Sequence, residues 1–140
     1  MKEVREYIET KKQGVLELHI KETEEKLGAA FPMQYRDLIK LVNNAEVGEW
    51  ILYPIKDSRN ATKTWDDIVR QNVDMRDEYM TENLIIIGDD GSGDKLCFKK
   101  NNGKMDDEIY IWYHADDEME EISPSLKEFI LETIHGDDAF

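Results

Sequence analysis

The sequence predicts an α+β fold in which a mostly antiparallel, twisted sheet is flanked by helices. Apolar residues recur at helical spacing through most of the first half of the chain, whereas residues 84–114 hold short apolar runs separated by turn residues. Strands joined by short turns pair antiparallel, and helices must then cover a face of the sheet. The 140 residues contain no repeat, linker or break in composition, so residues 1–140 are expected to form a single domain.

Two helical segments are expected near the start of the chain. A short stripe of Val4, Tyr7 and Ile8 indicates a first helix that packs loosely. A second helix is predicted from about Ile20 to Leu27, with Ile20, Thr23 and Leu27 on its buried face. This helix is expected to stop at Gly28, because glycine adopts a left-handed backbone at little cost.

A third helix, a strand and a fourth helix are expected next. The third helix begins at Pro32, whose missing N–H costs nothing in a first turn, and ends at Asn43–Asn44. Its buried face holds Tyr35, Leu38, Ile39 and Val42. Residues Trp50 to Tyr53 indicate a strand that Pro54 closes. The segment from about Thr62 to Tyr79 is predicted to be helical, with a buried stripe of Trp65, Ile68, Val69 and Val73.

The second half of the chain is expected to form a strand meander. Leu84–Ile87 is an apolar, β-branched run typical of a buried strand, and residues 88–94 form a turn. Residues 96–98 are the next strand, 101–103 another turn, and 108–114 a third strand.

The last strand and a final helix complete the expected elements. In the strand, one face carries Ile109, Ile111 and Tyr113, and the opposite face carries Tyr110 and Trp112. The helix begins near residues 123–125, where Ser125 and Glu128 have the spacing of a capping box. Its buried face is expected to hold Leu126, Phe129, Ile130 and Ile134.

The composition indicates which partners suit the chain. Its 32 acidic and 18 basic side chains give a formal net charge of −14, which repels nucleic acid and anionic membranes and attracts basic proteins. Solubility is an equally good explanation of this charge. Cys97 is the single cysteine, so no internal disulfide can form. With no segment like a signal peptide or a membrane span, a cytoplasmic location is expected.

The glycine- and aspartate-rich segment 88–94 (GDDGSGD) is the first candidate site. A phosphate loop is disfavoured, because its aspartates repel phosphate and a strand, not a helix, follows. A calcium loop of the EF-hand type lacks the required glycine and glutamate, since Lys95 and Asn101 occupy those positions, although weak calcium binding stays open. A tight hairpin turn, with glycines at positive φ and aspartates bonded to local N–H groups, is the favoured interpretation.

No catalytic or metal centre is predicted. Paired carboxylates such as Asp116 and Asp117 are so abundant that they carry no specific sign of glycoside hydrolysis. Cys97 lies in an apolar strand and is expected to be a small buried side chain. The three histidines lack metal-ligand spacing, and we expect no cofactor. At least two of the three tryptophans are expected in the core, and Trp112 is the preferred contact residue.

The ordered series of segments resembles the SUKH superfamily, which is named for yeast cell-wall regulators and bacterial immunity proteins. The resemblance rests on Ile20, Glu24-x-x-Leu27-Gly28, Phe31-Pro32-x-x-Tyr35-Arg36-x-Leu38, Asn43-Asn44, Ile87-Gly88-Asp89-Asp90-Gly91-Ser92-Gly93-Asp94, Leu96-Cys97-Phe98, Ile111-Trp112-x-His114 and Ser125-Leu126-x-x-Phe129-Ile130. Where relatives often have Asn-Gly, this chain has Asn43-Asn44, which still permits a turn because asparagine also adopts left-handed backbone. The interval 50–79 carries little family signal.

This resemblance implies a SUKH-like fold and a non-catalytic protein that binds and neutralises a cognate protein toxin, for which a basic nuclease domain is one candidate. The acidic composition suits such a partner. The expected contacts are Asp89, Asp90, Asp94, Trp112, Asp116 and Asp117. A regulatory or scaffold module without a toxin partner is the alternative, and a small hydrolase with paired carboxylates is a third hypothesis. No oligomeric state is predicted.

Overall fold

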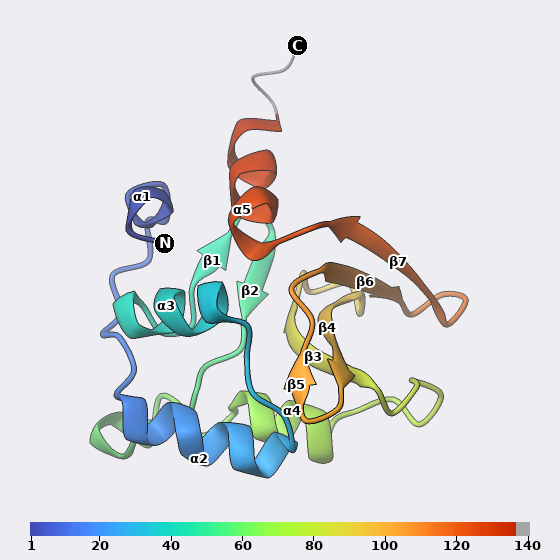
Figure 1. The fold of residues 1–140 in the computed structure, drawn as a ribbon, viewed down its shortest axis with the longest axis horizontal. Coiled ribbons are helices and arrows are strands. Elements are labelled where there is room, and N and C mark those ends of the chain that lie inside the picture. Colours follow the sequence, from blue (N-terminus) through green and yellow to red (C-terminus); the bar gives the residue numbers. More distant parts are fainter. Residues whose placement is uncertain (137–140) are drawn as a thin grey trace.

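The computed structural model describes residues 1–136, which form one seven-stranded sheet with α-helices packed around it (Figure 1). The helices are α1 (Lys2–Arg5), α2 (Glu17–Leu27), α3 (Met33–Leu41), α4 (Ile68–Val73) and α5 (Leu126–His135), and a single 3-10 turn covers Ser58–Asn60. The strands are β1 (Glu46–Val47), β2 (Trp50–Leu52), β3 (Leu84–Asp89), β4 (Lys95–Asn101), β5 (Lys104–Met105), β6 (Ile109–Tyr113) and β7 (Glu118–Ser123). This arrangement confirms the predicted α+β fold class.

The sheet has the strand order β1-β2-β3-β4-β6-β7, and the short strand β5 pairs with β4. Every pair of named strands is antiparallel, and the one parallel contact in the described residues is an isolated bridge between Ala30 and Lys104. The two edge strands are β1 and β7, and neither has a further strand on its outer side within residues 1–136. Helix α5 contacts both of them. Strand β7 is the longer of the two, and we call its outer side the free edge.

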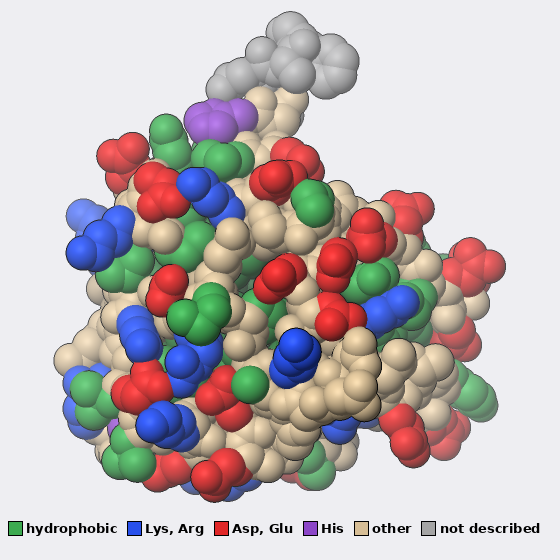
Figure 2. All heavy atoms as spheres, viewed as in Figure 1, with side chains coloured by type: hydrophobic (Ala, Val, Ile, Leu, Met, Phe, Trp, Pro, Cys, Tyr) green, Lys and Arg blue, Asp and Glu red, His purple; other side chains and the backbone are tan. Residues whose placement is uncertain are grey.

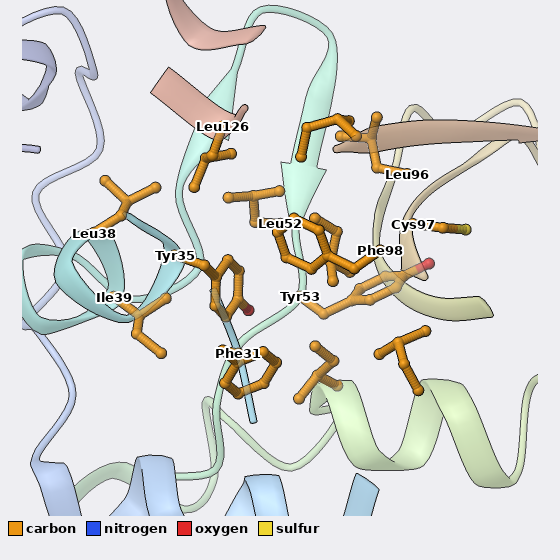
Figure 3. Packing of buried hydrophobic residues seen from close by; sticks show 14 of the residues in the cluster. Phe31, Tyr35, Leu38, Ile39, Leu52, Tyr53, Leu96, Cys97, Phe98 and Leu126 are labelled. Atoms are coloured by element: carbon orange, nitrogen blue, oxygen red, sulfur yellow. The ribbon is translucent and has the colours of Figure 1, made fainter. Parts of the chain in front are cut away.

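The core lies between the sheet and helix α3. Tyr35 of α3 is fully buried and meets Phe98 of β4 edge-on, with ring centroids 5.6 Å apart, while Phe31 packs on its other side at 4.5 Å. Figure 3 shows Phe98 pointing toward Tyr35, whereas Cys97 points to the opposite side of β4. Successive side chains of a strand point to opposite faces of the sheet. Because Cys97 and Phe98 are both buried, both faces of β4 are covered.

Local chemistry places several helix ends and turns where the sequence predicted them. Gly28 ends α2 with φ of 77°, and the Ser125 side chain accepts the N–H of Glu128 at the start of α5. Asn44 has φ of 56°, so the turn after α3 does form with asparagine in the left-handed region. The first helix, by contrast, does not pack loosely, because Val4 is completely buried against the rest of the core.

The helix expected over residues 62–79 is much shorter than predicted. Helix α4 begins only at Ile68, where the side chain of Asp67 accepts the N–H of Arg70, and it ends at Val73. Upstream, Thr64 bonds to the backbone of Asp57, and such local side-chain bonds compete with helix formation. The predicted buried stripe is also wrong at its ends, because Trp65 and Val73 are 62% and 67% exposed.

Two further expectations about the strands are corrected. Gly88 and Asp89 belong to β3 and not to the turn, which is therefore confined to residues 90–94. Strands β1, β5 and β7 were not anticipated. Strand β7 carries mostly charged side chains, so its sequence lacks an apolar run, and its pairing with β6 through the backbone defines it as a strand.

Candidate functional site

The candidate site lies at the end of the sheet where the 90–94 turn meets the β6–β7 hairpin. The imidazole Nδ1 of His114 lies 2.7 Å from Oδ1 of Asp94, and the His114 backbone N–H donates to the same oxygen at 3.2 Å. Gly93 packs directly beside this ring, since a Cβ at Gly93 would lie 3.0 Å from it. These contacts join two turns that are about twenty residues apart in sequence into one surface.

The 90–94 turn is stabilised by its own aspartates. Asp90 accepts the Ser92 N–H at 2.9 Å and the Ser92 hydroxyl at 2.6 Å, and Asp89 accepts the Gly91 N–H at 3.1 Å. Gly91 and Gly93 both have positive φ. These bonds confirm the hairpin-turn interpretation of this segment. Burial opposes ionisation of Asp90, but the hydrogen bonds from Ser92 outweigh it and lower the pKa of this carboxyl.

The carboxylate of Asp89 contacts two side chains outside the 90–94 turn. The Tyr53 hydroxyl donates to its Oδ2 at 2.7 Å, and Lys95 Nζ lies 3.6 Å from the same oxygen. Burial is the main cause of the raised pKa of Tyr53, and the bond to Asp89 raises it further. The Asp89 carboxylate is therefore already paired with Tyr53 and Lys95, although its side chain is 28% exposed against 23% for Asp94. Asp90 and Asp94 have no lysine or arginine partner among residues 1–136.

The β6–β7 hairpin adds a second group of acids. Asp116 accepts the Glu118 N–H at 3.2 Å, and Asp117 has φ of 58°, so both shape the turn while their side chains stay exposed. Along β7, Glu118, Glu120 and Glu121 are exposed as well. We call Asp90, Asp94, Asp116, Asp117, Glu118, Glu120 and Glu121 the acidic surface.

Two tyrosines of β6 lie within this group of carboxylates. The hydroxyl of Tyr110 donates to Glu121 at 3.3 Å, and that of Tyr113 donates to Glu120 at 3.4 Å. Burial first, and then these glutamates, raise the pKa of both phenols. The sequence predicts contacts among acidic and aromatic residues of the 106–121 region, which includes these tyrosines and glutamates, but neither kind is among the individually expected contacts.

Figure 2 shows the distribution of charge over one face of the molecule. On the side of β6 and β7, acidic side chains predominate, whereas around the helices at the opposite side acidic and basic side chains are interspersed. On this face, acidic side chains are therefore most frequent on the side of β6 and β7.

Trp112, the preferred contact residue, is not on this surface. It is 3% exposed, so it belongs to the core and is removed from the candidate contacts. A register shift between Ile109 and Tyr110 breaks simple alternation in β6, so that Ile109 and Trp112 are both buried. The expectation of at least two core tryptophans is also wrong, because Trp50 is only partly buried and Trp65 is exposed.

The described residues provide little for covalent chemistry. Cys97 is buried, and burial raises the pKa of its thiol to about 12, so it stays protonated and unreactive at neutral pH. Within residues 1–136, no three His, Cys, Asp or Glu side chains are grouped closely enough to hold a metal ion. In the same range, no helix is long and apolar enough to cross a membrane.

The architecture is thus an α+β sheet whose edge strand β7 carries mostly charged side chains. The family model SUKH_5, described as SMI1-KNR4 cell-wall, matches residues 1–135. The chain therefore belongs to the SUKH superfamily, whose domains are of the immunity type and are generally non-catalytic. No curated protein matches the sequence.

Proposed function

We propose that this protein is a single-domain, cytoplasmic immunity protein that binds a cognate protein toxin through the acidic surface and neutralises it without catalysis. The observation that carries the proposal is the contact between His114 and Asp94, which unites the acids of two turns beside the free edge of the sheet. Membership of the SUKH superfamily supports the immunity role.

Electrostatics favours a basic toxin, and a nuclease domain suits this requirement. The catalytic face of a nuclease is basic because its substrate is a polyphosphate. An acidic inhibitor is attracted to that face, and complementary charge raises the association rate more than the final affinity. The carboxylates of the acidic surface supply this complementarity, and they include the exposed side chains of Asp116 and Asp117 in the hairpin turn.

The free edge of β7 suggests how the partner docks. An edge strand offers unpaired backbone N–H and C=O groups to an extended segment of another chain. Here Glu118 and Glu120 lie along that edge, and they would pair with lysine or arginine side chains of an added strand. The same charges discourage pairing with a second copy of this chain, which is a common use of charged residues on edge strands.

Co-expression with the product of a neighbouring toxin gene tests the proposal. We expect the wild-type protein to protect cells and to form a complex whose association rate falls steeply with salt. The triple variant D116N/D117N/E120Q should slow association about tenfold or more at low salt. The matched control E22Q/E25Q/D37N removes three charges from α2 and α3 and should bind like the wild type. Equal toxicity with and without the protein would refute the proposal for that pair.

A regulatory or scaffold module is the second candidate, and a different surface favours it. Large apolar side chains are exposed in the segment of chain that connects β2 to β3. They are Trp65, Val73, Met75 and Tyr79. Arg70 stacks 4.8 Å from the centre of the Trp65 ring, and exposed aromatic and arginine side chains are frequent at binding hot spots. If W65A abolishes capture of several cellular partners while D116N/D117N/E120Q changes none, the scaffold role replaces the immunity role.

A further inference from the structure

A cleft lies on the helical side of the molecule, away from the acidic surface. It has a volume of about 560 Å³ and is formed by three segments, which are residues 11–13, residues 43–44 and the connection 54–64. Volumes of this size are typical of pockets for small molecules. In Figure 1 the first of these segments, which follows α1, and the β6–β7 hairpin lie at opposite sides of the view.

Three lysines line this cleft: Lys11, Lys12 and Lys63. Lys12 donates to the amide oxygen of Asn44, and this bond leaves its charge without a carboxylate. The side chains of Lys11 and Lys63 have neither a hydrogen bond nor an ion pair among residues 1–136. In a chain with nearly twice as many acidic as basic side chains, three unpaired lysines around one cleft are unexpected.

The one carboxylate in the cleft lining is already neutralised. Asp57 is buried and accepts from Arg59 through Nε at 3.0 Å and through a terminal nitrogen at 2.8 Å. The Arg59 guanidinium, above all by these hydrogen bonds, lowers the pKa of Asp57 below its usual value. The pair contributes no net charge, so the charge of the lysines dominates the cleft.

The rest of the lining supplies neutral polar groups. The amide of Asn43 is buried and bonds to both the N–H and the C=O of Ile55, which fixes this wall of the cleft. The side chain of Asn60 is exposed, lines the cleft and has no hydrogen bond within residues 1–136, so it is free to donate to a ligand. One wall of the cleft is thus fixed, and the exposed lysines beside it are free to reach an anion.

We infer that this cleft binds a small molecule that carries one or more phosphate groups. Three lysine charges match a ligand with two or more negative charges, and lysine binds phosphate as a point charge. The net charge of −14 does not prevent this, because charges further away than about 8 Å are largely screened at physiological salt. This site is separate from the acidic surface and independent of the proposed immunity role.

A titration followed by two-dimensional amide NMR tests the inference, with inorganic pyrophosphate, ADP and citrate as probes at physiological salt. We expect saturable shifts of the amide signals of residues 11–13, 43–44 and 60–64 with pyrophosphate and ADP. The variant K11Q/K63Q should weaken this binding at least tenfold. The matched control K21Q/K26Q removes two lysine charges from α2, outside the cleft, and should bind like the wild type.

Three outcomes would overturn the inference. One is the lack of saturable shifts in the cleft at millimolar probe concentrations. Another is an equal loss of affinity in K11Q/K63Q and K21Q/K26Q, which would show binding to general positive charge. The last is binding of citrate as tight as that of pyrophosphate, which would show that the cleft does not select phosphate. The amide spectra of the free variants establish that both remain folded.

Discussion

Asp94 accepts two hydrogen bonds from His114, one from the backbone N–H at 3.2 Å and one that involves the ring Nδ1 at 2.7 Å. Both residues lie in turns that adjoin the paired strands β4 and β6, so their bonds add to the pairing of Lys95 with Trp112. The contribution of this pair to the geometry of the acidic surface can be tested separately from binding.

Replacement of Asp94 by alanine should loosen this surface with only a small loss of stability. The pair is partly exposed, so we expect D94A to lower the free energy of unfolding in urea by about 1 kcal/mol or less. The amide signals of residues 114–117 should nevertheless shift strongly, because both bonds to His114 are lost. The control D107A removes an exposed carboxylate that makes no side-chain hydrogen bond among residues 1–136. If D94A and D107A perturb residues 114–117 equally, the contact does not organise the hairpin.

The left-handed backbone of Asn44 gives a second prediction. Its side chain donates to the Leu52 carbonyl at 2.7 Å and accepts from Lys12, and both alanine and glycine remove these bonds. Only alanine keeps a Cβ at φ of 56°. We therefore expect N44A to be less stable than N44G by about 1 kcal/mol in urea unfolding, because glycine adopts this backbone without steric cost. Equal stabilities would show that the side-chain bonds alone determine the preference for asparagine.

The buried thiol of Cys97 gives a prediction about alkaline pH. Burial raises its pKa from an ordinary value of 9.0 to about 12, so the unfolded chain loses the thiol proton first as pH rises. The contribution of the protonated Cys97 thiol to the free energy of unfolding is present below pH 9 and is lost progressively as the pH rises toward 12. By pH 10 the loss from this group should be about 1 kcal/mol, because pH 10 lies about one unit above the ordinary pKa of the thiol.

The variant C97A isolates this contribution from those of tyrosine and lysine. Whatever its stability at neutral pH, the decrease in its unfolding free energy between pH 7.5 and 10 should be smaller than that of the wild type. A thiol reagent should also label the native protein far more slowly than the urea-unfolded protein at pH 8. Identical pH slopes, or rapid labelling of the native protein, would mean that Cys97 is accessible.

Some helix ends could be predicted from the sequence because a few neighbouring residues decide them. Gly28 at positive φ and the Ser125 cap are examples. The side-chain faces of β6 could not be predicted, because a register shift between Ile109 and Tyr110 depends on how β7 pairs with β6. Strand β7 itself was missed for a related reason. Its exposed glutamates resemble a loop, and only long-range backbone pairing makes it a strand.

The candidate site was predictable in its residue types but not in its assembly. The aspartates of both turns were visible as acidic clusters, yet the sequence did not indicate that Asp94 meets His114. Trp112 was misplaced, because an aromatic residue in a short strand has no local signal that distinguishes a core position from a surface position. The lysine-lined cleft is assembled from three distant segments, and only the folded chain brings them together.

The crowding of like charges on the acidic surface should reduce the stability of the fold. Repulsion among Asp116, Asp117 and Glu120 opposes the compact hairpin, and no lysine or arginine is paired with any of them in the described residues. We therefore expect D116N/D117N/E120Q to raise the free energy of unfolding by about 0.5–1 kcal/mol in about 20 mM salt. The amide side chains keep the oxygen acceptors for the Glu118 N–H and the Tyr113 hydroxyl, so the variant changes charge and little else.

The control E22Q/E25Q/D37N distinguishes this local effect from a general reduction of net charge. These three acids lie on α2 and α3 near Lys21, Lys26 and Lys40, so their removal also removes attractive contacts and should leave stability unchanged or slightly lower. The difference between the two triple variants should vanish in about 0.5 M salt, where the screening length falls below the spacing of most of these charges. A protein that keeps a destabilising cluster of charge is consistent with selection of that cluster for binding. Equal stabilisation by both variants at low salt would instead assign the acidity to the whole molecule, and solubility would then explain it as well as a basic partner does.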